Sequence, residues 1–250
     1  MPNCHIRIYL AYLLVLFPVA DASGTFAMEE RKRQPKISEL RIGSLQLADG
    51  DMEAALAVLK LRAESRILVG FEKALGERNR ISLDLNDPTV GEILDRLCKA
   101  DPRYTFEFSG ETLVNVFPLG AKVDPTNLLN LRVRHAVINE KRTPEDVIRR
   151  IPDFAPELSK YLEDKAKEQA KRSGMPQGAV GHRMSGNMDP QISLEFQNVT
   201  VREILNAVSL FSADLSRKYS HFAAVSWKYE FVVDPKATTG LGGYPKWDVS

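Results

Sequence analysis

A strand-like pattern that runs into a helix-like pattern occurs twice in the chain. Residues 81–97 (ISLDLNDPTVGEILDRL) and residues 192–208 (ISLEFQNVTVREILNAV) align without a gap at an offset of 111 residues, with eight of 17 positions identical. In both segments, apolar residues at every second position predict a strand with one buried face. Apolar residues at helical spacing then predict an amphipathic helix. The chain is therefore expected to contain two copies of one structural unit.

The start of each predicted helix carries a capping motif. Thr89 precedes Glu92 by three residues, and Thr200 precedes Glu203 by the same interval. Thr and Glu at this spacing form a capping box, in which each side chain accepts a hydrogen bond from the backbone N–H of the other residue. Both helices are expected to begin directly after the threonine.

Further elements are predicted on both sides of the first segment. The limits of these elements are marked by aspartate caps, by helical spacing, by short apolar runs and by the turn residues Ser109 and Gly110. In chain order they are a helix over residues 52–64 capped by Asp49 or Asp51, a strand over 67–71, and a hairpin of strands over 104–108 and 112–117.

The second half begins in a similar way but contains an insertion. A strand is predicted over residues 131–138, with Leu131, Val133, His135 and Val137 on one face, and Thr143-Pro144 opens a helix. Proline then interrupts the helical pattern. The later features are breaks at Pro152 and Pro156, a charged helix over 156–172, a glycine-rich stretch over 173–190 and a strand over 227–233.

These elements predict an α+β fold of two tandem modules, each with helices packed on short β-sheets. The second module is expected to carry a helical and glycine-rich insertion. The predicted divisions are a signal peptide over residues 1–22, a polar linker over 23–40, modules over 41–120 and 128–235 with the insertion over 152–190, and a glycine-rich tail over 236–250.

The first module resembles the secretin and TonB short N-terminal (STN) domain. The resemblance is carried by the alternating strand, the T-V-x-E-I-L helix start and the closing hairpin. It covers residues 45–117 of the first copy and about 192–210 of the second. It implies a small α+β module with two helices, used in bacterial envelopes to dock to secretion-channel or TonB-type signalling components. It implies no catalytic residues.

The N-terminus predicts export. Residues 8–20 form an apolar run without a charge, which is too short for a membrane-spanning helix, and Ala20-Asp21-Ala22 fits a signal-peptidase site. We expect a mature start near Ser23, a periplasmic or otherwise exported protein, and no integral membrane span after cleavage. An uncleaved N-terminal anchor is the alternative interpretation.

Composition and charge narrow the function classes. The chain has 34 Lys and Arg against 33 Asp and Glu, so its formal net charge is +1, which does not favour nucleic-acid binding. The usual catalytic signatures are missing, so a non-enzymatic protein without a cofactor is expected. His135 is interpreted as a satisfied, partly buried histidine, and Cys98 as a small buried hydrophobe.

A metal-handling or ligand-binding role is the alternative function. Met175, His182, Met184 and Met188 lie within 14 residues, and thioether and imidazole groups are ligands that Cu(I) prefers. The spacing of these residues is irregular. A loop that is rich in methionine without binding metal therefore remains the competing interpretation.

The predicted partner site is the last strand of the first module. This strand is expected to be a sheet edge to which an extended segment of an envelope protein could add, because it comes last in the module and Pro118 ends it. A strand that only closes its own sheet is the alternative. The residues are Thr112, Leu113, Val114, Asn115, Val116 and Phe117.

Overall fold

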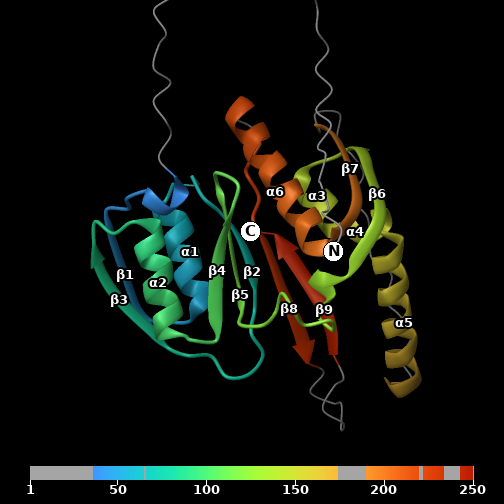
Figure 1. Cartoon of the computed structure of the whole chain (residues 1–250), viewed down its shortest axis with the longest axis horizontal. Helices are drawn as coiled ribbons and strands as arrows, with labels where there is room; N and C mark the ends of the chain where they lie inside the picture. Colours follow the sequence, from blue (N-terminus) through green and yellow to red (C-terminus); the bar gives the residue numbers. More distant parts are fainter. Residues whose placement is uncertain (1–35, 65, 174–189, 220–221, 234–242, 250) are drawn as a thin grey trace, which may run out of the picture. The chain divides into compact units, whose positions relative to one another are not determined.

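The computed structural model describes residues 36–64, 66–173, 190–219, 222–233 and 243–249, which belong to one structural unit. We call residues 37–118 the first module and residues 128–249 the second module (Figure 1). The first module contains η1 (Ile37–Glu39), β1 (Ser44–Gly50), α1 (Met52–Arg62), β2 (Leu68–Glu72), β3 (Ile81–Asn86), α2 (Val90–Ala100), β4 (Tyr104–Ser109) and β5 (Leu113–Pro118). The second contains η2 (Leu128–Asn130), β6 (Arg132–Lys141), α3 (Pro144–Arg149), α4 (Ile151–Phe154), α5 (Pro156–Ser173), β7 (Gln191–Thr200), α6 (Val201–Lys218), β8 (Trp227–Val233) and β9 (Gly243–Val249).

The predicted α+β class is confirmed. Strands β1 and β3 form one antiparallel pair, and β6 and β7 form another. A five-stranded sheet has the order β4-β5-β2-β8-β9. The apolar faces of α1 and α2 pack between the β1-β3 pair and this central sheet in one hydrophobic core. The second module has its own core, built around α3 and α6.

The central sheet contains strands of both modules. β2 runs parallel to β5 on one side and parallel to β8 on the other, so Gly70 lies opposite both Asn115 and Trp227. Val69 and Phe71 belong to the core of the first module, whereas Leu68 packs with Ala213 of α6. The helices of the two modules therefore cover opposite faces of one sheet. The sequence pattern predicted tandem modules but not this shared sheet.

The capping predictions are confirmed in both modules. Thr89 Oγ1 accepts from Glu92 N at 3.2 Å, and Thr200 Oγ1 accepts from Glu203 N at 3.2 Å. The two glutamates accept in return from the threonine backbones, which completes both capping boxes. Asp51 caps α1 by accepting from Ala54 N at 2.9 Å, so the second of the two predicted aspartates is used.

The repeat extends beyond the segment recognised in the sequence. Arg41 Nη1 donates to Asp87 O at 2.7 Å, and Arg132 Nη1 donates to Asn198 O at 2.8 Å. Asp87 and Asn198 both have a left-handed backbone, with φ of 49° and 53°. The short helices η1 and η2 occupy matching places before these arginines. The predicted linker 23–40 is therefore too long, because Ile37 already lies buried in the core of the first module.

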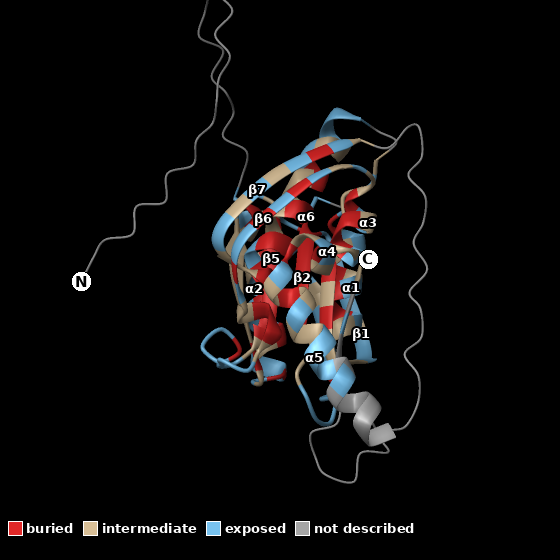
Figure 2. Cartoon of the chain, turned by 90° about the vertical axis from the view of Figure 1, so that its right-hand side faces the viewer, coloured by how far each residue is buried: buried red, intermediate tan, exposed pale blue. Residues whose placement is uncertain are grey.

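The expected buried face of residues 131–138 is wrong. Val133 is buried, but His135 and Val137 are exposed, and Ala136 and Ile138 are buried instead. The side-chain alternation changes face next to Asn198, where the left-handed backbone interrupts the regular pleat of β7. Figure 2 shows the resulting mixture of exposed and buried positions along β6 and β7.

The C-terminal region also differs from the prediction. The expected glycine-rich tail contains β9, which pairs antiparallel with β8 over its whole length. The proline breaks are confirmed, since α3, α4 and α5 are separate helices with Pro152 and Pro156 at the starts of the latter two. Among the helices that the structure describes, none combines the length and apolar character of a membrane span.

Candidate functional site

The strand predicted as an edge lies inside the central sheet. β5 is flanked by β4 and β2, and Leu113, Val114, Asn115, Val116 and Phe117 are all buried. The prediction that residues 112–117 form a free edge is therefore wrong. Its error was to equate the last strand in sequence with the last strand in the sheet, whereas β2, an earlier strand, pairs with the other side of β5. Thr112 precedes β5, and its carbonyl oxygen accepts a hydrogen bond from Leu68 N.

The edges of the central sheet are β4 and β9. No described strand pairs with the outer side of either one. β9 contains Pro245, which lacks a backbone N–H, and a proline is a common protection of an edge strand. β4 contains neither proline nor a basic residue, and five of its six residues are partly exposed. Within the central sheet, the open backbone edge on the side of the first module is therefore β4, and the two-stranded sheet of β1 and β3 has open outer sides of its own.

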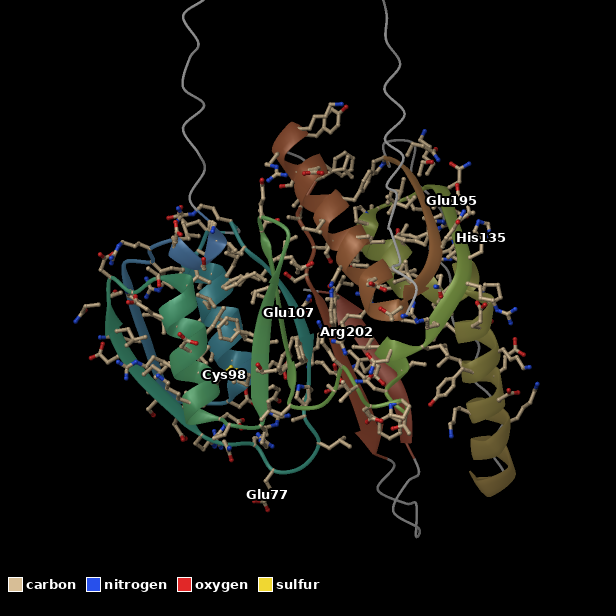
Figure 3. The ribbon with its side chains drawn as sticks, viewed as in Figure 1. Glu77, Cys98, Glu107, His135, Glu195 and Arg202 are labelled. Atoms are coloured by element: carbon tan, nitrogen blue, oxygen red, sulfur yellow. The ribbon has the colours of Figure 1, made fainter. Side chains whose placement is uncertain are left out.

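A buried ion pair connects the two modules across the central sheet. Arg202, in the first turn of α6, donates from Nη2 to Glu72 Oε2 at 2.7 Å, and both residues are 4% exposed. Asn127 Nδ2 donates to the other carboxylate oxygen, and the guanidinium lies 5.3 Å from the centre of the Phe117 ring. Burial and the negative charge of Glu72 raise the pKa of Tyr229. Figure 3 shows Arg202 in the interior, between α6 and the central sheet.

Next to this pair, the sheet has close packing that requires a glycine. A Cβ atom on Gly70 would lie 2.3 Å from Asn115 Oδ1 and 2.5 Å from Trp227 Cζ2. Trp227 donates from its indole N–H to Asn206 Oδ1 at 3.0 Å. The side chain of Asn115 is fully buried and has no hydrogen-bond partner among the described residues. The close packing around Gly70 therefore holds the two modules together at this point.

A charged depression of about 520 Å³ lies where α1 begins and β2 ends. Lys73 Nζ is 2.9 Å from Glu230 Oε2, Arg78 Nη1 is 2.9 Å from Asp51 Oδ2, and Lys228 pairs with Glu53. The hydrogen bond from Lys73 lowers the pKa of Glu230 although burial opposes the shift. Positive and negative groups are thus paired with each other, so the depression presents no excess of charge to a ligand.

The residues considered for chemistry are separated in the structure. His135 Nε2 lies 3.3 Å from Glu195 Oε1 in an exposed pair on the outer face of β6 and β7 (Figure 3). Cys98 lies on α2, where burial raises the pKa of its thiol to about 11, which favours the protonated thiol at neutral pH. Cys98 packs against the apolar core as expected for a small hydrophobe, but it is only partly buried, whereas a buried residue was expected.

Met175, His182, Met184 and Met188 all lie outside the described residues, as do residues 1–35 with the expected signal peptide. Within the part of the chain that the structure describes, no three or more His, Cys, Asp or Glu side chains form a group that could hold a metal ion.

Comparison with protein-family models, with curated proteins and with solved structures found no match for this chain.

Proposed function

We propose that the protein is an exported, non-enzymatic interaction module of a bacterial envelope, which docks to secretion-channel or TonB-type signalling components. The observation that carries the proposal is the open edge of β4 in a first module that has the two helices and short sheets implied by the STN resemblance. An open edge offers backbone donors and acceptors to an extended segment of another protein. The predicted export signal supports the part of the proposal that places the protein in the bacterial envelope.

Site-specific photocrosslinking in the envelope fraction would test this role. A photoreactive amino acid at Thr105, on β4, should capture an envelope protein that co-purifies with the tagged chain. The matched control carries the same amino acid at Asp95, an exposed residue of α2 in the same module. If no envelope protein is crosslinked at Thr105 or at other exposed positions, the interaction role is contradicted. A tagged chain recovered from the cytoplasm with its N-terminus intact would contradict export.

A further inference from the structure

The open edge of β4 has a counterpart in the same molecule. β4 reads YTFEFS from Tyr104, and β8 reads WKYEFV from Trp227. Each strand follows the repeated helix and pairs antiparallel with the last strand of its module, Tyr104 opposite Pro118 and Trp227 opposite Val249. β4 and β8 are therefore equivalent strands. Phe106 matches Tyr229, and Glu107 matches Glu230.

In β8, the edge that corresponds to the open edge of β4 is occupied. β2 pairs with it in the parallel direction, with Glu72 opposite Tyr229, and Lys73 N donates to Tyr229 O at 2.8 Å. The backbone of Tyr229 thus points toward β2. By the equivalence of the two strands, the backbone of Phe106 points toward the open edge of β4. The molecule itself shows that an edge of this type accepts a parallel strand.

The charges at the two edges are also comparable. Glu230 pairs with Lys73 of the incoming strand at 2.9 Å, besides having Lys228 and Lys246 within 4 Å. Glu107 pairs with Lys122, which lies in the segment between the two modules, and the described residues provide it with no counterpart of Lys73. Its side chain remains 35% exposed. A basic residue on an added strand would therefore meet a carboxylate at β4, as Lys73 does at β8.

One feature of the β8 edge does not transfer to β4. Gly70 is required there because the indole of Trp227 leans over β2. Tyr104 leans in the other direction, since its hydroxyl accepts from Ala74 N at 2.9 Å and its ring centre lies 5.8 Å from that of Phe71. Both contacts lie across β5 from the open edge. A partner residue opposite Tyr104 therefore needs no special size.

We infer that the outer edge of β4 binds an extended segment of a partner protein that runs parallel to β4 and places a lysine or arginine beside Glu107. The inference rests on the proposed function in one respect, namely that the segment bound at the edge of β4 belongs to another protein. Pairing of β4 with β4 of a second copy would not fit, because two-fold symmetry makes a strand antiparallel to its own copy.

A peptide with the sequence of β2 and Lys73 (LVGFEK) is the probe for this site. Its binding to the purified full chain would be followed by fluorescence anisotropy at low salt. A second peptide ends in glutamate in place of the lysine. We expect the lysine peptide to bind at least about tenfold more tightly, because only it can pair with Glu107. Hydrogen exchange should show the amide of Phe106 protected by the bound peptide.

Charge reversal at the site provides the decisive comparison. Glu107→Lys should reverse the preference, so that the glutamate peptide binds more tightly. Asp84→Lys, the same reversal at an exposed position of β3, should leave the preference unchanged. If Glu107→Lys fails to give the parent circular dichroism spectrum, Glu107→Gln replaces it, and the preference for lysine should then disappear.

Several results would overturn the inference. They are the absence of binding by both peptides, equal affinity for both, a preference that Glu107 variants do not alter, and protection confined to residues outside β4. A dimer of the free chain with β4 already protected would also overturn it, since the occupant would then be a second copy. Envelope capture at positions other than Thr105, together with no peptide binding, would remove this inference and leave the proposed function standing.

Discussion

The two modules differ in one strand. The first module has a strand between its first helix and its repeated strand, and the described residues of the second module include no such strand. In the first module this strand is β2, which follows α1 and pairs with β5. In the second module, α4 and α5 occupy that part of the sequence, and the described residues there include no such strand. β8 pairs with β2 of the first module instead. By the equivalence of β4 with β8 and of β5 with β9, a counterpart of β2 would lie beside β9, where no described strand pairs, and β2 instead joins the two modules at β8.

The largest effect is expected from separating the modules. A fragment of residues 36–122 loses β8 and β9 but keeps β2, β4 and β5 of the central sheet and the whole core of the first module, so it should unfold cooperatively in urea. A fragment of residues 123–250 loses β2 and Glu72, which exposes Trp227 and leaves Arg202 without its carboxylate partner. We expect no cooperative transition for this fragment by circular dichroism. Two independently stable fragments would show that the shared strand is not needed.

Arg202→Leu tests the contact between the modules in the full chain. The substitution leaves Glu72 as a buried carboxylate without its cation, which typically costs about 3–5 kcal/mol in the free energy of unfolding. Urea denaturation measures this loss. Arg41→Leu is the control, because Arg41 pairs with Asp87 at an exposed position and should contribute much less. Equal losses for the two variants would refute the role of the buried pair.

The two helix caps offer a smaller and symmetrical test. Thr89→Ala and Thr200→Ala should each cost about 1 kcal/mol, because each removes the side chain that accepts from the first turn of its helix. Similar losses in thermal unfolding would support equivalent modules. Ser193→Ala, at an exposed position of β7, should change the stability little. A loss at only one threonine would show that the modules use their caps differently.

Acid pH should affect the first module through Asp101, which ends α2. Hydrogen bonds from Arg103 lower the pKa of Asp101, outweighing the burial that opposes the shift. Because the folded-state pKa lies below the unfolded one, this carboxylate stabilises the fold at neutral pH, and its contribution is lost as the pH falls through the folded-state value.

Asp101→Asn should therefore be less stable than the parent chain at pH 7, and the difference should narrow below about pH 4. Urea denaturation at both pH values measures the change. A difference that is independent of pH would contradict the assignment. In the second module α6 continues through the corresponding position, Ser212, so no equivalent acid sensitivity is expected there.

Local signals predicted most of the elements. The capping boxes at Thr89 and Thr200, the hairpin after α2 and the proline breaks around α4 all depend on residues close in sequence, and the structure confirms them. The sheet order depends on pairing between residues 157 positions apart, such as Gly70 and Trp227. No local pattern encodes such a pairing.

Two features that were not predicted, the interior position of β5 and the equivalence of β4 with β8, nevertheless have a signal in the sequence. The segment Leu113–Pro118 begins LVNVF, and β2 begins LVGF. Nearly continuous apolar runs are typical of strands covered on both faces, so an interior position was the better interpretation. Continuing the repeat past the helices, with the offset rising from 111 to 123 residues, would have matched Glu107 with Glu230. The pairing of Arg202 with Glu72 had no such signal, because Gly91 stands at the equivalent position of the first module.

The shared strand also has a consequence for how a growing chain folds. Synthesis proceeds from the N-terminus, so every residue of the first module is present well before β8. During that interval β2 has β5 on one side and nothing on the other, which leaves an apolar strand edge exposed at the centre of the future sheet. Such an edge can recruit β8 from a neighbouring chain, giving a domain-swapped dimer. Local protein concentration during synthesis would then decide between the monomer and the swapped form.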